Sequence, residues 1–200
     1  AIRSRGLGDV YKRQISNGTI GSSSPRRQAM IKSLGKNINV IEMRGNINTR
    51  LKKIKNSNID GIILAKAGLR RMEMDSLITQ NLSVESFVPS PGQGVLCIEC
   101  LSQHSEIMSK IRKIVHLNTE ICVSAERIFA AQMDGDCMSP IGAHATIQKD
   151  LITITGFVAT ADGTRYIRNK IEGNKNNYKD LSTKLSNLFI KMGSKGMLKC

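Results

Sequence analysis

The sequence predicts two fold classes in succession: an α/β domain with a parallel sheet, then a small α+β domain with an antiparallel three-stranded sheet and helices. The first prediction rests on apolar strand patterns that alternate with helical patterns between residues 19 and 71. The second rests on three strand patterns between residues 144 and 172, joined by short turns and followed by a helical pattern. Alternating strands and helices are typical of parallel sheets covered by helices on both faces, whereas hairpins pair strands antiparallel.

Three short strands are predicted in the first half, over residues 19–22, 37–43 and 59–65. The last of these is an apolar run with a single aspartate, as expected for a strand covered on both faces. A helix is predicted after each strand, beginning at Pro25, Ile47 and Ala67. Ser24 suits the N-cap of the first helix and Pro25 its first position, where no amide hydrogen is needed.

The middle of the chain starts with a break at residues 87–94, where two prolines and two glycines interrupt regular structure. The apolar run over residues 95–101 predicts a buried strand, and Cys97 and Cys100 within it are interpreted as structural. Helices are predicted over residues 105–115 and 120–133, the second capped by Asn118 and Thr119.

Three strands are predicted in the last part of the chain, over residues 144–148, 151–159 and 165–172. The turns between them are Lys149-Asp150 and Ala161-Asp162-Gly163, and the second is a strong hairpin signal. Leucines at 181, 185 and 188 then recur at helical spacing, which predicts a final helix.

These patterns divide the chain into four parts. Residues 1–14 show no convincing period and are interpreted as foreign or disordered sequence. Residues 15–88 are the α/β domain, residues 89–115 a crossover segment, and residues 116–200 the C-terminal α+β domain.

Composition limits the partners. The 200 residues carry a net charge of +14, which is compatible with nucleic acid, a membrane surface or a polyanionic ligand. Aromatic residues make up only 4% and do not interleave with the arginines, so a nucleic-acid interface is the weakest of these hypotheses. No apolar run is long enough to span a membrane. Five cysteines without disulfide-like spacing favour a reducing compartment, and no metal site is predicted.

Basic side chains follow the predicted strands at the points where the strands end. Because the carboxyl ends of parallel strands meet at one edge of a sheet, they predict a single anion site there. The arginine fork matches carboxylates with two hydrogen bonds, which favours a ligand rich in carboxylates. The alternative is that each arginine is a solvated surface charge. The candidate residues are Ser24, Arg26, Arg27, Arg44, Arg50 and Arg71.

Cys137 lies in a loop bracketed by Gly135 and Gly142, after a predicted helix and before the strands. Such a cysteine is expected to be mobile and reachable, unlike one packed on a strand. The alternative is a small apolar residue in a tight turn.

Five motifs stand in order along the chain: Gly21 to Gln28, Arg44 to Leu51, Ala67 to Arg71, Pro91 to Gly94, and Gly135 to Gly142. Together they resemble porphobilinogen deaminase, also called hydroxymethylbilane synthase, and the resemblance runs from about Thr19 to the C-terminus. The family joins four porphobilinogen molecules head to tail into hydroxymethylbilane, with loss of ammonia at each step.

The resemblance implies a dipyrromethane cofactor held by Cys137 through a thioether, and a first half shaped like periplasmic binding proteins. It implies that the cofactor side groups are bound by Ser24, Arg26, Arg27, Arg44 and Arg50. It implies that the substrate or growing chain contacts Arg71, Gln93 and Gly94. The expected partners are porphobilinogen and polypyrrole intermediates, without nucleic acid or membrane.

The resemblance also implies three domains, with the catalytic aspartate in a first domain absent from this sequence. Residues 89–115 would then return to that domain, and the chain by itself would be inactive. The full-length protein is expected to be a cytoplasmic monomer, or plastid-located in a photosynthetic eukaryote. The alternative function is a non-catalytic anion-binding module of the periplasmic-binding-protein type.

Overall fold

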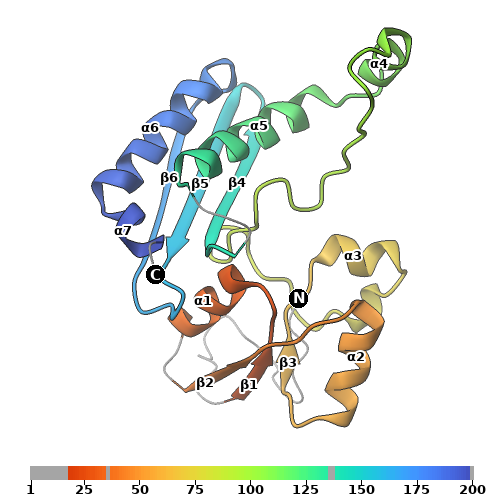
Figure 1. Cartoon of the computed structure of the whole chain (residues 1–200), viewed down its shortest axis with the longest axis vertical. Coiled ribbons are helices and arrows are strands. Elements are labelled where there is room, and N and C mark those ends of the chain that lie inside the picture. Colours follow the sequence, from red (N-terminus) through yellow and green to blue (C-terminus); the bar gives the residue numbers. More distant parts are fainter. Residues whose placement is uncertain (1–17, 35–36, 135–137, 199–200) are drawn as a thin grey trace.

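The computed structural model describes residues 18–34, 37–134 and 138–198, and these form two separate sheets with their helices (Figure 1). A three-stranded parallel sheet belongs to the first half of the chain and a three-stranded antiparallel sheet to the second. Helix α1 lies between the two sheets (Figure 1). The predicted succession of a mixed α/β half and an antiparallel half with helices is confirmed.

The parallel sheet has the order β2-β1-β3, with Ile20 of the central strand opposite Val40 and Gly61. Its strands are β1 (Gly18–Gly21), β2 (Ile38–Ile41) and β3 (Gly61–Ile62). The helices that follow them are α1 (Pro25–Leu34), α2 (Ile47–Asn56) and α3 (Lys66–Arg71), and a short 3-10 helix follows at Asp75–Leu77. Strand β3 is much shorter than the predicted 59–65, because the chain leaves the sheet soon after Ile62.

Helices cover both faces of this sheet, as predicted. Ile20 and Ile63 pack with Met30 of α1 in one buried cluster. Ile62 packs with Leu69 of α3 in another cluster, to which α2 also contributes. Neighbouring residues of a strand point to opposite faces, so the placement of Ile62 and Ile63 in different clusters follows from the strand pleat.

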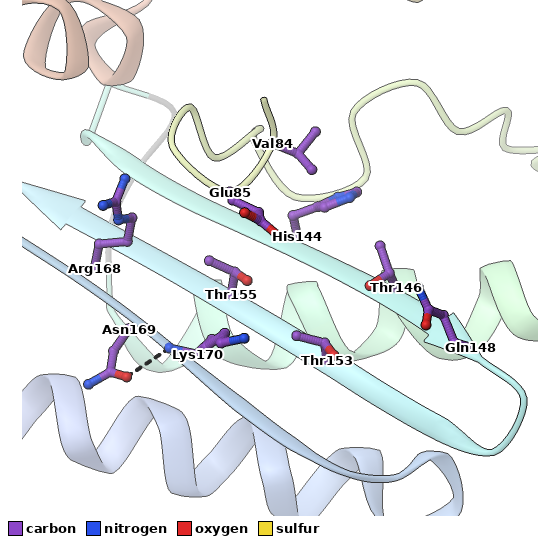
Figure 2. Close-up of a pocket in the computed structure, with 10 residues that line it drawn as sticks. All are labelled: Val84, Glu85, His144, Thr146, Gln148, Thr153, Thr155, Arg168, Asn169 and Lys170. Atoms are coloured by element: carbon purple, nitrogen blue, oxygen red, sulfur yellow. Dashed lines mark hydrogen bonds between the residues drawn. The ribbon is translucent and has the colours of Figure 1, made fainter. Parts of the chain in front are cut away.

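The antiparallel sheet has the order β4-β5-β6 and is formed by β4 (Ile141–Gln148), β5 (Leu151–Ala159) and β6 (Tyr166–Asn174). The bounds of β5 agree with the prediction, whereas β4 begins three residues earlier than predicted. One face of the sheet is polar, and His144, Thr146, Thr153 and Thr155 line a hollow there (Figure 2).

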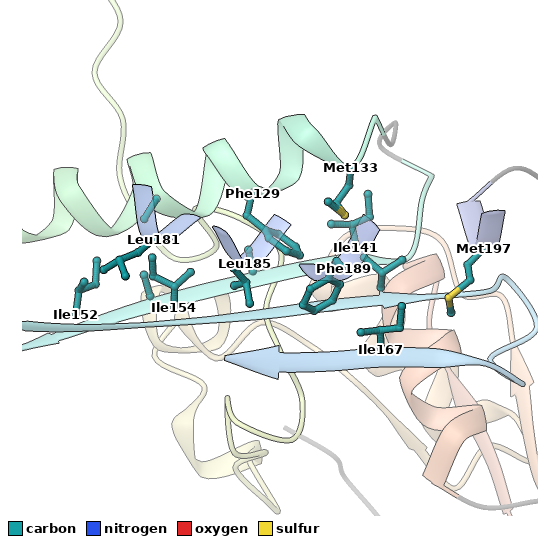
Figure 3. Close-up of a cluster of buried hydrophobic side chains, with 14 residues drawn as sticks. Phe129, Met133, Ile141, Ile152, Ile154, Ile167, Leu181, Leu185, Phe189 and Met197 are labelled. Carbon is teal, nitrogen blue, oxygen red and sulfur yellow. The ribbon is translucent and has the colours of Figure 1, made fainter. Parts of the chain in front are cut away.

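The other face carries the largest core, shown in Figure 3, between the sheet and its helices. These helices are α5 (Leu117–Gln132), α6 (Tyr178–Lys191) and α7 (Ser194–Leu198), with a 3-10 turn at Lys175–Asn177. Phe129 and Phe189 meet edge to face, with 4.9 Å between ring centroids. A Cβ on Gly156 would lie 2.6 Å from Cζ of Phe129, so this aromatic pair requires a glycine on the strand beneath it.

Helix α5 begins three residues earlier than predicted. Its N-cap is His116, whose Nδ1 accepts a hydrogen bond from the backbone N–H of Thr119 over 3.3 Å. The predicted cap at Asn118 and Thr119 is therefore wrong. An imidazole nitrogen can accept the free amide of a first helical turn in place of the usual hydroxyl or carboxylate.

The predicted buried strand over residues 95–101 is wrong. This segment forms no strand, and the exposed fraction of Leu96 is 76% and that of Ile98 is 56%. The structural interpretation of Cys97 as a buried residue fails with it, because Cys97 is exposed. The segment leads away from both sheets to α4 (Ser105–Arg112), as Figure 1 shows. A strand needs a partner for its backbone, and none of the described residues pairs with this one.

The two halves are joined through α1 and β5. Phe157 and Ala159 of β5 pack into the same buried cluster as Met30 of α1 and Val88. Gly163, in the turn between β5 and β6, lies against α1, where a Cβ would be 2.7 Å from the carbonyl oxygen of Ala29. Among the helices that the structure describes, none is both long and apolar enough to cross a bilayer.

Candidate functional site

The candidate site begins where β1 ends and α1 starts. The backbone N–H of Gln28 donates to the carbonyl oxygen of Ser24 over 2.9 Å, and the N–H of Arg27 lies 3.5 Å from Oγ of Ser24. Ser24 therefore caps the helix as predicted. This helix start lies at the carboxyl edge of the parallel sheet. The free amides and the positive dipole end of a helix N-terminus would favour an anion bound there.

Arg26 is the most buried of the predicted site residues that the structure describes, with an exposed fraction of 4%. Its Nη1 donates to the carbonyl oxygen of Val88, and its Nη2 donates to Oε1 of Gln93 over 3.2 Å. Burial, and secondly the charge of Arg27, lowers the pKa of Arg26 to about 9. A negative ligand bound beside Arg26 would favour its charged form and oppose this shift.

Arg27 and Arg50 complete what we call the arginine cluster, which consists of Arg26, Arg27 and Arg50. Nη1 of Arg27 donates to the carbonyl oxygen of Ile63 over 3.3 Å, which ties it to the end of β3. Burial, and secondly the charge of Arg50, lowers the pKa of Arg27. Nε of Arg50 donates to the carbonyl oxygen of Gly45 over 2.7 Å. Within residues 18–34, 37–134 and 138–198, no carboxylate forms an ion pair with any of the three.

Arg44 and Arg71 are not part of this cluster. Arg44 is exposed, and its Nε forms an ion pair with Oε1 of Glu42 over 2.6 Å. Arg71 is exposed at the end of α3. The structure therefore brings three of the predicted arginines together and leaves two on the surface.

Gln93 lies in a turn over residues 90–94 that closes against the cluster. Its Oε1 accepts hydrogen bonds from the backbone N–H and the hydroxyl of Ser90, over 3.3 and 3.2 Å, in addition to the one from Arg26. Gly94 has a φ of 90°, and a Cβ there would lie 3.8 Å from Cβ of Ala67. The turn thus lies next to the start of α3.

The motif over residues 135–142, which we call the cysteine loop, contacts the site at its last residue, Gly142. Cys137 itself, with residues 135 and 136, lies outside the described residues. A Cβ on Gly142 would lie 3.2 Å from Cδ of Arg26 and 3.0 Å from the carbonyl oxygen of Val88. The five motifs therefore converge: the first contributes Arg26 and Arg27, and the others contribute Arg50, Ala67, Gln93 and Gly142.

Two participants were not predicted from the sequence. One is the carbonyl oxygen of Val88, which accepts from Arg26. The other is Glu126 on α5, a buried carboxylate that accepts from the backbone N–H of Gly92 over 2.6 Å and from that of Ala145 over 2.8 Å. The position of Glu126 beside the apolar face of a predicted helix could have indicated a buried carboxylate. It could not have indicated the partners, Gly92 and Ala145, because both are distant in sequence.

The hollow on the open face of the antiparallel sheet has a volume of about 550 Å³ and is a different place. Figure 2 shows the threonines of β4 and β5 along its floor, with Glu85, which precedes the crossover segment, above them. None of the predicted site residues within the described ranges lines it. In the part of the chain that the structure describes, no group of three or more His, Cys, Asp or Glu side chains is placed to hold a metal ion.

Comparison with known proteins matches both halves of the chain. Residues 8–109 match the family described as "Porphobilinogen deaminase, dipyromethane cofactor binding domain". Residues 120–191 match "Porphobilinogen deaminase, C-terminal domain". The first match begins inside residues 1–14, and the foreign origin proposed for that segment stays a prediction.

Several curated relatives are similar over most of this chain. The porphobilinogen deaminase of Clostridium botulinum strain Kyoto is 41% identical over 172 residues, which are 86% of this chain and 58% of the relative. That of Alkaliphilus metalliredigens is 40% identical over 179 residues, or 90% of this chain and 57% of the relative. That of Trichlorobacter lovleyi is 34% identical over 179 residues. The chain thus spans less than two thirds of these relatives, and with both of its halves matched it belongs to the porphobilinogen deaminase family.

Proposed function

We propose that this chain forms the cofactor-bearing part of an enzyme that condenses four porphobilinogen molecules into hydroxymethylbilane, with release of ammonia. The observation that carries the proposal is the contact between the last residue of the cysteine loop and the arginine cluster. An ideal Cβ on Gly142 would lie 3.2 Å from Cδ of Arg26. The segment that carries Cys137 in the sequence therefore ends in contact with the arginine cluster, which we take as an anion site.

The residues of this site fit a ligand with several carboxylates. Burial, and secondly the charge of a neighbouring arginine, lowers the pKa of Arg26 and of Arg27, and no carboxylate of the described chain forms an ion pair with the cluster. A dipyrromethane with acidic side groups would relieve that repulsion through charge-assisted hydrogen bonds. When bound, this group supplies the pyrrole at which chain growth begins.

We assign the holding of that group to the Cys137 sulfur, through a thioether, and to Ser24 and the arginine cluster. Arg44 would bind one of its outer carboxylates after exchanging its present partner, Glu42, for the ligand. Arg71, Gln93 and Gly94 would contact the substrate or the growing chain. Orientation by several fixed donors lowers the entropy cost of bringing the reacting rings together.

We further propose that residues 1–200 by themselves do not turn over porphobilinogen. The resemblance assigns the catalytic aspartate to sequence that is not part of this chain, and no acidic residue here is offered as its substitute. We also propose kinship of the first half with periplasmic binding proteins, on the basis of its β2-β1-β3 parallel order and its site at the strand ends.

The test is a chimera that completes this chain with the part of the Alkaliphilus metalliredigens relative that the alignment does not cover. Purified from cells that make porphobilinogen, the chimera should carry a two-pyrrole adduct by intact mass and should consume porphobilinogen. Cys137→Ser should lose both, while the matched control Cys122→Ser, on α5, should retain both. Residues 1–200 without the added part should show no turnover above a blank.

A non-catalytic anion-binding module predicts a different result. It would bind porphobilinogen reversibly through the arginine cluster and show no adduct in any form. An adduct that maps to Cys97, Cys100 or Cys122 would contradict the assignment of Cys137.

A further inference from the structure

Glu126 is a buried carboxylate that joins three parts of the chain. It lies on α5 with an exposed fraction of 5%. Its Oε2 accepts from the N–H of Gly92 over 2.6 Å, and its Oε1 accepts from the N–H of Ala145 over 2.8 Å and lies 3.5 Å from Nδ1 of His144. Within the described part of the chain, no lysine or arginine pairs with it. Burial of such a charge is costly, and here the two short backbone bonds offset that cost.

The segment that Glu126 holds lies along the free edge of β4. This strand is at the edge of its sheet, so alternate N–H groups point outward. The N–H of Ala143 donates to the carbonyl oxygen of Pro89 over 2.9 Å, and the next outward N–H, that of Ala145, donates to Glu126. Pro89 and Glu126 thus accept hydrogen bonds from two successive outward N–H groups of β4.

The same segment holds Arg26. Val88 and Gln93, on either side of Pro89 and Gly92, both accept hydrogen bonds from the Arg26 guanidinium. A continuous series of bonds therefore runs from Glu126 through the turn over residues 90–94 to Arg26. Without the bond at Gly92, the bond at Pro89 would be the one left between this turn and β4 or α5 among the described residues, and Gln93 would be held less firmly against Arg26.

We infer that Glu126 is a positioning residue: its carboxylate fixes the turn over residues 90–94 against β4, and the turn sets the orientation of the Arg26 guanidinium. A carboxylate suits this role because it accepts at both oxygens, whereas the amide of a glutamine has one acceptor and would present an N–H to one of the two backbone donors. The effect on ligand binding rests on the proposed function, and the anchoring of the turn does not.

The experiment compares Glu126→Gln with the matched control Glu120→Gln, an exposed glutamate on the same helix, in the whole 200-residue chain. Amide exchange followed by NMR should accelerate about tenfold or more at Gly92 or Ala145 in Glu126→Gln, as loss of a charge-assisted bond requires. The amide of Leu185, in the core of α6, should not change. The guanidinium resonances of Arg26 should shift in Glu126→Gln alone, and the dissociation constant for porphobilinogen should rise about threefold to tenfold.

Several outcomes would overturn the inference. Equal acceleration at Gly92 and Leu185 would show that Glu126 serves only overall stability, and so would failure of both Glu126→Gln and the shorter Glu126→Asp to fold. Unchanged exchange at both Gly92 and Ala145 would show that neither bond holds the turn. If the unmodified chain does not bind porphobilinogen but the local exchange and the Arg26 resonances respond as described, the anchoring stands and the proposed function fails.

Discussion

Arg26 donates a hydrogen bond from Nη2 to Oε1 of Gln93 over 3.2 Å, across 67 positions of sequence. This bond joins α1, the first helix of the parallel-sheet half, to the turn near the start of the crossover segment. It also gives Arg26 a structural role that a ligand-binding arginine does not need. Arg26 is therefore both a candidate ligand contact and a support of the turn, whereas Arg27 and Arg50 are less buried.

The first prediction separates these two roles. Arg26→Leu should lower the free energy of unfolding by about 1–3 kcal/mol, because the carbonyl of Val88 and the amide of Gln93 lose a buried donor. Arg70→Leu, which removes an exposed arginine paired with Asp75, should change it by about 0.5 kcal/mol or less. Urea unfolding at neutral pH measures both. Equal effects of the two substitutions would show that the bonds of Arg26 do not contribute to stability.

The second prediction concerns the close approach at Gly142. A Cβ there would lie 3.0 and 3.1 Å from the carbonyl oxygens of Val88 and Pro89, which are backbone atoms and yield little. Gly142→Ala should therefore lower the free energy of unfolding by about 1–3 kcal/mol. The matched control is Gly196→Ala on α7, where nothing lies within 4 Å of an added Cβ.

The thermal unfolding temperature of Gly142→Ala should be lower than that of Gly196→Ala. The Gly196→Ala protein should unfold at the same or a slightly higher temperature than the unmodified chain, because alanine favours a helix by up to about 1 kcal/mol. A Gly142→Ala protein as stable as the Gly196→Ala protein would mean that the crossover segment does not pack against β4 in solution.

The third prediction concerns the exposed apolar segment over residues 95–101. Leu96 and Ile98 are exposed on a chain segment without a partner among the described residues, so we expect copies of the 200-residue chain to associate through it. The double substitution Leu96→Lys and Ile98→Lys should reduce that association, since charge on an unpaired edge opposes it. Sedimentation velocity at several concentrations measures the change.

A single exposed leucine outside this segment provides the comparison. Leu34→Lys, at the end of α1, adds charge at a site whose exposed fraction, 52%, is close to that of Ile98. If Leu34→Lys suppresses association as strongly as the double substitution, net charge and not the segment controls it.

The sequence alone was sufficient to predict the features that depend on local pattern. The period of two in residues 151–159, with a turn signal on each side, predicted β5 to the residue. The sequence Ser24-Pro25 predicted the start of α1, and the start of α2 at Ile47 was also predicted. The structure adds that Oδ1 of Asn46 accepts from the N–H of Thr49 over 2.9 Å. The order of the five motifs was enough to indicate the family.

Only the tertiary structure decided which side chains are buried and what they bond. The arginines at 26 and 44 read alike in sequence, yet one is buried against Val88 and Gln93 and the other is exposed beside Glu42. The run over residues 95–101 has a strand composition, but a strand exists only where a second backbone satisfies its hydrogen bonds, and the described chain supplies none. Glu126 bonds to Gly92, 34 positions away, and no local pattern encodes that distance. Local pattern specifies the period and the ends of an element, because those depend on neighbouring residues, whereas burial and long-range hydrogen bonds depend on which elements meet after the chain has folded.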